Sequence, residues 1–239
     1  MNALNIIILA AGSADFVVED GDYPVCLVEI GGKPLLERVI TNASRVEGAA
    51  LYFAFRSDQI ARFHLDKIVN LLVPDATVVS ISDQTMGSGC TALMVASMLS
   101  ENEEVLIVSA NELVDIALDV VVQSFRDRHL DAGTITFPSV HPRYSYVRVD
   151  SEGNVTEVSQ KVPISKRATA GVFWAARAGD FVESIKQMIR KDANVDGQYY
   201  IAKAFNEIIL KQKKMGFYDI NSENYHPLKT ARQVEQFQL

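Results

Sequence analysis

The beginning of the chain limits the possible folds more than any other segment. Asn5–Ala10 is a continuous apolar run, and it leads through Ala11 and Gly12 into a long loop. After the loop, Ile30–Leu35 reads Ile-Gly-Gly-Lys-Pro-Leu and opens a helical pattern. A short run that is apolar throughout predicts a strand covered on both faces, because a half-exposed strand would alternate apolar and polar residues. The segment therefore favours a parallel α/β sheet.

Strand and helix patterns alternate from this point to about residue 140. Such alternation predicts a parallel sheet with helices on both of its faces. The expected strands after the first are Leu51–Phe55, Thr77–Ile81, Val105–Val108 and Thr134–Phe137, and the expected helices are Pro34–Arg45, Asp58–His64, Ser88–Leu99 and Leu118–His129.

The pattern changes in the last hundred residues. Two alternating segments joined by a turn at Gly153 predict a β-hairpin. No internal repeat or linker follows, so we expect a single domain over residues 1–239. The hairpin strands are expected at Tyr144–Asp150 and Val155–Gln160, further strands at Ala168–Ala176 and Gly216–Ile220, and helices at Phe181–Arg190, Tyr200–Gln212 and Thr230–Phe237.

Charge and cysteine content argue against several classes of protein. The net charge of −7 argues against a nucleic-acid-binding surface. Cys26 and Cys90 lie far apart and form no Cys-x-x-Cys motif, as expected for two reduced thiols. Leu4–Ala11 is too short to span a bilayer and lacks the preceding Lys or Arg of a signal peptide. We therefore expect a cytoplasmic protein with no membrane anchor and no nucleic-acid partner.

The first 35 residues resemble the nucleotide-binding start of the sugar-phosphate nucleotidyltransferases, the NDP-sugar pyrophosphorylases. In that family the first loop carries a second Gly and an Arg, and a Lys follows the Pro. This chain has Ala14, no Arg and Val25 at those places. The resemblance assigns nucleotide contacts to Leu9, Ala10, Ala11, Gly12 and Ser13.

The resemblance also implies a fold. It is a Rossmann-like, three-layer α/β/α nucleotidyltransferase fold with a mixed, mostly parallel central sheet and an added β-hairpin region for the acceptor. Within the single domain, residues 1–138 would form the nucleotide-binding half. Residues 139–239 would form the half that binds the acceptor or sugar.

The first loop carries the wrong charge for a triphosphate. It has no Lys or Arg between Gly12 and Gly32, and Lys33 is the first cation. Each carboxylate about 4 Å from a phosphate costs roughly 1 kcal/mol in water. We therefore expect the loop to accept a triphosphate only through a bridging divalent metal or by moving aside. Its acidic residues are Asp15, Glu19, Asp20, Asp22 and Glu29.

A second motif, Gln84–Thr91, reads Gln-Thr-Met-Gly-Ser-Gly-Cys-Thr and opens a helix. In the family, a Gln and a Gly-rich turn at this place read the nucleotide base, and the resemblance assigns this role to Gln84, Gly87 and Ser88. A glutamine amide suits a base edge because it both donates and accepts hydrogen bonds. The alternative interpretation is a helix N-terminus built from small residues and capped by Ser88.

The family places a metal-binding Asp after the fourth strand, where this chain has Asn111 followed by Glu112. Mg²⁺ prefers anionic oxygen ligands, so the neutral amide of Asn111 is a weak replacement and Glu112 is the nearest carboxylate. The resemblance implies Mg²⁺ as the cofactor, with Asn111 and Glu112 as its ligands and Asn111 as a catalytic residue. Asp115 is expected to begin the next helix. Near the C-terminus only Thr230 matches the family, and a second metal-binding Asp is not evident.

Three further segments resemble the acceptor site of the family. They are Glu157–Pro163, Thr169–Phe173 and Gly197–Tyr200. Lys161 matches a catalytic Lys that would neutralise phosphate charge in the transition state. The residues expected to bind the acceptor are Gln160, Thr169, Gly171, Gln198 and Asn206, of which Gln160 and Gln198 stand where the family has Glu.

Three functions remain open. The first is an active nucleotidyltransferase that joins a nucleoside triphosphate to a sugar 1-phosphate or another phosphorylated alcohol, in a setting such as surface polysaccharide synthesis. The second, favoured by the lost charges, is an impaired relative that binds or regulates. The third is a glycosyltransferase, whose Asp-x-Asp metal motif occurs only at Asp20–Asp22 in the first loop. The sequence does not identify the base, the acceptor or the oligomeric state.

Overall fold

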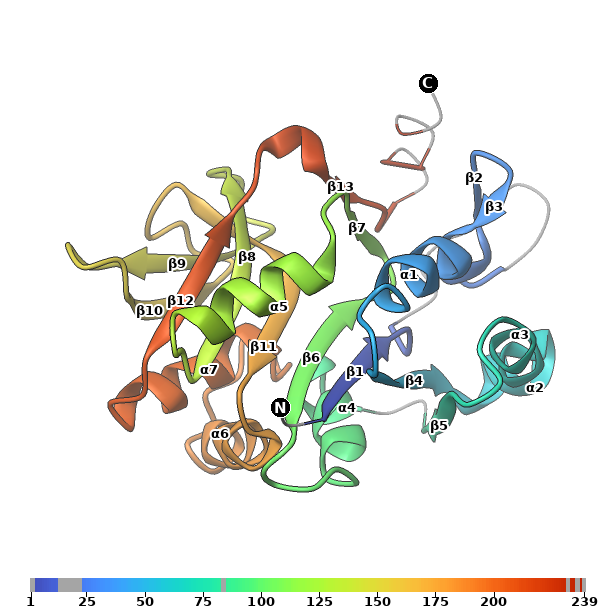
Figure 1. Cartoon of the computed structure of the whole chain (residues 1–239), viewed down its shortest axis with the longest axis horizontal. Helices are drawn as coiled ribbons and strands as arrows, with labels where there is room; N and C mark the ends of the chain where they lie inside the picture. Colours follow the sequence, from blue (N-terminus) through green and yellow to red (C-terminus); the bar gives the residue numbers. More distant parts are fainter. Residues whose placement is uncertain (1–2, 13–22, 83–84, 231–232, 235–236, 238–239) are drawn as a thin grey trace.

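The computed structural model of the chain describes residues 3–12, 23–82, 85–230, 233–234 and 237. Its main sheet has nine strands in the order β10-β9-β11-β6-β1-β4-β5, with β8 and then β12 beside β11 (Figure 1). All strands predicted from the sequence are present. Their bounds are β1 Leu4–Leu9, β4 Ala50–Arg56, β5 Thr77–Ile81, β6 Glu104–Ser109, β8 Ala132–Pro138, β9 Ser145–Val149, β10 Val155–Gln160, β11 Arg167–Ala175 and β12 Met215–Asp219.

The sheet is mixed and mostly parallel, as predicted. β1 pairs in parallel with β4 and with β6, and β4 pairs in parallel with β5. β11 is antiparallel to β6, β8 and β9, and β10 is antiparallel to β9, so β10 and β11 run against the other strands of this sheet. The chain leaves β1 on the β4 side and returns on the β6 side. This reversal leaves a crevice at the carboxyl ends of β1 and β6.

Helices cover both faces of the sheet, which confirms the three-layer prediction. Successive residues of a strand point to opposite faces, so Ile6 and Ile8 pack in one hydrophobic core and Ile7 packs in the other. The first core receives α1 (Leu35–Ala43), α3 (Leu65–Leu72) and α5 (Leu118–Asp127), and the second receives α4 (Ser88–Ala96), α6 (Ala178–Arg190) and α7 (Ile201–Leu210).

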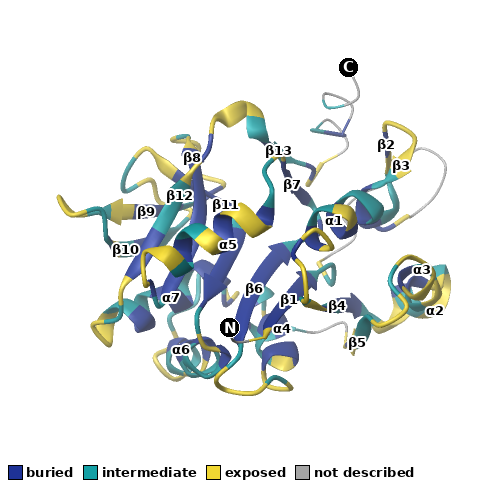
Figure 2. Ribbon diagram, in the orientation of Figure 1, coloured by how far each residue is buried: buried dark blue, intermediate teal, exposed yellow. Residues whose placement is uncertain are grey.

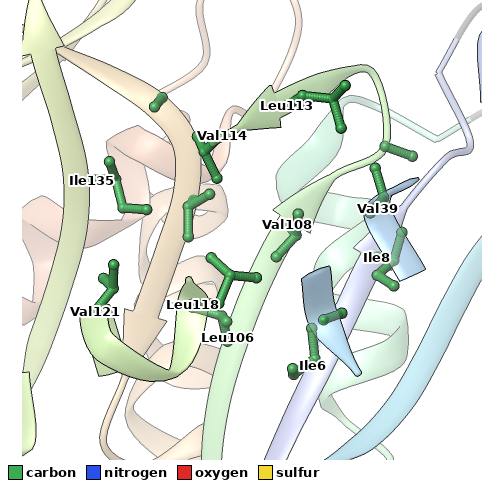
Figure 3. Close-up of a cluster of buried hydrophobic side chains, with 14 of the residues drawn as sticks. Ile6, Ile8, Val39, Leu106, Val108, Leu113, Val114, Leu118, Val121 and Ile135 are labelled. Atoms are coloured by element: carbon green, nitrogen blue, oxygen red, sulfur yellow. The ribbon is translucent and has the colours of Figure 1, made fainter. Parts of the chain in front are cut away.

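Figures 1 and 2 show the molecule from the side of the sheet that α1 and α5 cover. Figure 2 shows buried strands at the centre and helices whose outer surfaces are exposed. Figure 3 shows how apolar side chains of β1, β6, α1 and α5 meet, among them Ile8, Leu106, Val39 and Leu118. Trp174 on β11 is also buried in this first core, as predicted.

Helix α3 was not predicted. Instead of a single helix over Asp58–His64, the chain forms α2 (Ser57–Phe63), then α3 from Leu65. His64 separates them in a left-handed conformation, with φ of 53°. Helix α3 has eight residues, of which Leu65 and Val69 are buried and Leu71 is exposed.

Several short elements also escaped prediction. β7 (Glu112–Val114) pairs with β13 (Tyr225–Pro227), which lies more than a hundred residues later, so no local pattern reports this pairing. Asp115 does not begin α5 as predicted, because it follows β7 and its carboxylate lies 2.7 Å from His226. The other short elements are a 3₁₀ turn at Val25–Leu27, the pair β2 (Glu29–Ile30) and β3 (Lys33–Pro34), and a 3₁₀ turn at Ser222–Asn224.

The helix predicted at Thr230–Phe237 lies partly outside the described residues, within which Gln233, Val234 and Phe237 are helical. Across the described ranges, no helix has the length and apolar character needed to cross a membrane.

Candidate functional site

A cleft of about 660 Å³ opens at the carboxyl ends of β1 and β6 and continues over β10 and β11. In open α/β sheets, ligands bind where the strand order reverses, and this cleft lies at that position. It brings together twelve of the residues selected from the sequence. From the first half these are Leu9, Ala11, Gly12, Gly87, Ser88, Asn111 and Glu112, and from the second half Gln160, Lys161, Thr169, Gly171 and Gln198.

Ser13 and Gln84, both predicted to contact the nucleotide, lie outside the described residues. Ala10 lines a smaller adjoining cavity of about 50 Å³, together with Val25 and Gln59. Its backbone N–H donates to the carbonyl of Ala54 at 2.9 Å, continuing the pairing of β1 with β4.

Asn206 does not line the cleft. Its side chain Oδ1 accepts from the Val158 N–H at 2.8 Å, and its Nδ2 donates to the Val158 carbonyl at 2.7 Å. These two bonds fasten α7 to β10, so the amide has a structural partner in place of the predicted acceptor. Lys33 also lies away from the cleft, where it pairs with Glu37 on α1.

Four basic side chains line the cleft, and Glu112 is the one carboxylate among its described lining residues. The sequence analysis identified only Lys161. It missed Arg56 at the end of β4, Arg143 before β9 and Lys229 after β13. Arg56 was detectable, because β4 is parallel to β1 and both strands end at the same edge of the sheet. Arg143 and Lys229 reach the cleft only through tertiary folding.

Lys161 directly follows the hairpin strand β10 and has a left-handed conformation, with φ of 63°. Its ammonium lies 2.7 Å from the carboxylate of Asp196 and 5.5 Å from the ring centre of Tyr200. The hydrogen bond with Asp196 raises the pKa of Lys161 above its ordinary value. Lys161 is therefore cationic across the physiological pH range, and its ammonium lines the cleft while paired with Asp196.

The hairpin contributes two more polar groups. Arg143 stacks on the ring of Tyr144, with its guanidinium carbon 4.8 Å from the ring centre. Gln160 accepts a hydrogen bond from the hydroxyl of Ser145 through Oε1. This bond occupies the amide oxygen and leaves the amide N–H₂ group as the donor that Gln160 can offer to a ligand.

Asn111 and Glu112 lie at the end of β6, where the magnesium site was predicted. The Oδ1 of Asn111 accepts a hydrogen bond from the Ser109 hydroxyl at 2.8 Å. Glu112 is buried, with 5% of its side chain exposed, and one carboxylate oxygen forms an ion pair with Lys229. The other, Oε2, has no hydrogen-bond partner among the described residues, and it lies against Gly171.

These groups do not fit a magnesium ion. A hard dication needs anionic oxygens, but Asn111 is neutral and already accepts a hydrogen bond, while the ammonium of Lys229 would repel a cation beside Glu112. Nowhere in the described part of the chain do three or more His, Cys, Asp or Glu side chains gather to hold a metal. The donor set at this place therefore does not match the Mg²⁺ ligands that the resemblance implies.

The turn before α4 packs closely against the segment that precedes α7. Gly87 has φ of 102°, and a Cβ there would lie 2.8 Å from the backbone of Tyr199. Gly89 is equally close and donates its N–H to the Tyr199 carbonyl at 2.7 Å. Ser88 does not cap the helix; its Oγ lies 3.4 Å from the N–H of Ile201. The small residues thus pack the start of α4 against the segment before α7, and this contact shapes one wall of the cleft.

Several solved structures share this architecture. No family model matches the sequence, and no curated protein matches it. Among solved structures, the nucleoside-diphosphate-sugar pyrophosphorylase from Vibrio cholerae RC9 is similar at 17% identity and a TM-score of 0.80, over 97% of this chain and 99% of that one. A UDP-glucose pyrophosphorylase, solved with UDP-glucose, is similar at 14% identity and a TM-score of 0.79, over 99% and 97%.

A third structure, from Bacillus anthracis, is assigned as a glucose-1-phosphate thymidylyltransferase and was solved with sucrose. It is 12% identical, with a TM-score of 0.77 over 99% of this chain and 94% of that one. At these identities the likeness establishes the fold. The chain therefore has the nucleotidyltransferase fold of the NDP-sugar pyrophosphorylases, over almost its whole length, as the resemblance in its sequence implied.

Proposed function

We propose that the protein is a nucleotidyltransferase that joins a nucleoside triphosphate to a sugar 1-phosphate or a similar phosphorylated acceptor and releases pyrophosphate. The observation that carries this proposal is the charge of the cleft. Arg56, Arg143, Lys161 and Lys229 reach it from four separate elements, although the first loop has no cation of its own. Phosphoryl-transfer sites depend on such positioned positive charge, because catalysis there is mainly orientation and electrostatic stabilisation.

The two halves of the fold suggest a division of labour. Residues 1–138 would bind the nucleotide at the ends of β1 and β6 and at the start of α4. Residues 139–239 would bind the acceptor through Thr169, Gly171, Gln160 and Gln198. The bound UDP-glucose and sucrose of two structural neighbours support a sugar as part of the ligand. Both cysteines are free thiols, which supports a cytoplasmic setting.

In this reaction a phosphate oxygen of the acceptor attacks the α-phosphorus of the triphosphate. A new P–O bond forms, the bond to the bridging oxygen between the α- and β-phosphorus atoms breaks, and pyrophosphate leaves with that electron pair. The attacking oxygen is already anionic, so no general base is needed. Lys161 and Arg143 would neutralise the acceptor phosphate and the charge that develops in the transition state. Asn111, held by Ser109, would position the nucleotide.

A second function, ligand binding without turnover, is favoured by one observation. Asn111 stands where the family has a metal-binding Asp, and its oxygen is already occupied by Ser109. A neutral pocket of the same shape retains hydrogen bonds to a nucleotide but loses metal-assisted charge stabilisation. The two functions differ in whether pyrophosphate is released.

The test has two stages. Thermal unfolding against CTP, UTP, dTTP, ATP and GTP, each with and without Mg²⁺, identifies a bound nucleotide, because ligand at about 100 times its Kd adds roughly 2.7 kcal/mol of stability. Pyrophosphate release is then measured with that nucleotide and a panel of phosphorylated acceptors, beginning with glucose 1-phosphate. Release that depends on acceptor and is lost in Lys161→Met supports the enzyme. Binding without release supports the second function, and no stabilisation by any nucleotide rejects both.

A further inference from the structure

The segment after β13 is held directly beside the end of β6. β13 pairs with β7 so that Pro227 lies opposite Glu112. The N–H of Leu228 then donates to the carbonyl of Asn111 at 2.9 Å, and the N–H of Lys229 donates to the Oε1 of Gln233, also at 2.9 Å. These two hydrogen bonds hold the backbone that leads into Lys229. The fold brings the C-terminal segment to the place of the expected metal, but it delivers an ammonium group in place of a second carboxylate.

The Lys229 ammonium is seated on Glu112 but is not buried with it. The side chain of Glu112 is 5% exposed and that of Lys229 is 44% exposed, and both line the cleft. A carboxylate taken out of water needs a charged or hydrogen-bonded partner, so Glu112 holds the ammonium in one position. Glu112 has its own fixed place, because only a residue without a Cβ fits at Gly171 against Oε2.

We propose that the Lys229 ammonium is a tethered cation that binds a phosphate group of the nucleotide and stands in for a divalent metal at the end of β6. This inference rests on the proposed function and names how that site takes a di- or triphosphate. Glu112 is then a positioning residue, because it touches Lys229 and not the phosphate. An ammonium offers up to three charge-assisted donors to phosphate oxygens, and it needs no ion from solution.

Inorganic pyrophosphate is the probe, because it carries the phosphates without a base or an acceptor. Its affinity for the full chain is measured by isothermal titration calorimetry, in EDTA and in Mg²⁺. The variants are Lys229→Met, which keeps the length but not the charge, and Lys229→Arg, which keeps the charge. Lys191→Met is the matched control. Lys191 has a side chain that is 51% exposed, and its ammonium pairs with the buried Glu207 at 2.7 Å. It does not line the cleft.

We expect wild-type protein to bind pyrophosphate in EDTA. Lys229→Met should weaken that binding by about tenfold or more, while Lys229→Arg and Lys191→Met stay within about threefold of wild type. Binding of the wild type that vanishes in EDTA and returns with Mg²⁺ would overturn the inference without any variant having to fold. Equal affinity in folded Lys229→Met protein, or no binding by wild type in either buffer, would overturn it as well.

These outcomes are separate from those of the proposed function. If pyrophosphate binds through Lys229 but no nucleoside triphosphate is turned over, the cation site stands and the enzyme activity fails. If turnover is found and is unaffected by Lys229→Met, the activity stands and the tethered cation fails.

Discussion

Gly171 of β11 lies directly against the carboxylate of Glu112, and a Cβ added at Gly171 would overlap Oε2. Gly171 also has φ of 70°, in the left-handed region that residues with a Cβ avoid. It lies where the register of β11 against β8 shifts, between Thr169 and Phe173. The irregularity in this strand therefore makes room for the one carboxylate among the described residues of the cleft, and through it fixes Lys229.

Gly171→Ala should destabilise the protein and displace Glu112. The backbone strain costs roughly 1–2 kcal/mol, and the overlap adds about 1–3 kcal/mol as the neighbours move apart. Urea denaturation measures the change in the free energy of unfolding. Gly153→Ala is the matched control, because Gly153 has φ of 86° but no atom within 4 Å of an added Cβ. Equal losses in the two variants would show that Glu112 does not constrain this position.

Lys161 gives a prediction about pH. The hydrogen bond with Asp196 raises the pKa of Lys161, so the ammonium form persists above the ordinary range of a lysine. The contribution of this charge to phosphate binding is present at neutral pH and is lost as the pH rises through the raised pKa of Lys161. Asp196→Asn should move that alkaline loss to lower pH, as measured by pyrophosphate affinity against pH. An unchanged profile would show that the pair does not set the charge of the cleft.

The stability of the first core depends on a buried polar group at its edge. Glu104 accepts hydrogen bonds from Nε1 of Trp174 at 3.1 Å and from the guanidinium of Arg126, with Nε–O distances of 3.0 and 3.1 Å. Glu104→Ala should cost about 3 kcal/mol, because it leaves the buried indole N–H and a largely buried Arg without partners. Trp174 is the single Trp of the chain, so its fluorescence follows the urea transition at this site.

The control for this prediction is Glu157→Ala. Glu157 pairs with Arg148 on the hairpin, but the side chains of the two residues are 43% and 54% exposed. Surface pairs contribute about 0–1 kcal/mol, so this variant should unfold close to wild type. A loss as large as that of Glu104→Ala would mean that burial does not distinguish the two ion pairs.

The sequence predicted the main sheet because each of its strands is a local run with a local pattern. The layered arrangement followed from βα alternation. β7 and β13 were missed because each has three residues and is stabilised by a partner more than a hundred residues away. Helix α3 was missed although its pattern is amphipathic, because it is short and begins directly after α2 and His64.

The difference between local patterns and long-range contacts also explains which residues of the candidate site were predicted. Gly12, Asn111 and Lys161 were selected because the segments that hold them resemble motifs of the family, and all three line the cleft. Arg143 and Lys229 depend on how the hairpin and the C-terminal segment fold over the sheet, and no spacing in the sequence reports that. The missing charges of the first loop suggested an impaired site. In the structure, four basic side chains outside that loop line the cleft.

Asn206 provides a test that separates a structural role from the acceptor contact expected from the sequence. The oxygen and the nitrogen of its side-chain amide both bind the backbone of Val158. Asn206→Ala therefore leaves one N–H and one carbonyl of β10 without these partners. This should cost about 1–3 kcal/mol in the free energy of unfolding. Because Asn206 does not line the cleft, the affinity for pyrophosphate or a phosphorylated acceptor, measured well below Tm, should stay close to that of wild type.

Gln198→Ala should have the opposite effects to Asn206→Ala on stability and on acceptor affinity. Gln198 lines the cleft, and among the described residues its side chain forms no pair of backbone hydrogen bonds like those of Asn206. Its truncation should leave the unfolding transition within about 0.5 kcal/mol of wild type, as for a substitution outside the core. Loss of acceptor affinity should then appear in Gln198→Ala and not in Asn206→Ala. The reverse result would return Asn206 to the acceptor site, and it would mean that the contact between α7 and β10 opens when the acceptor binds.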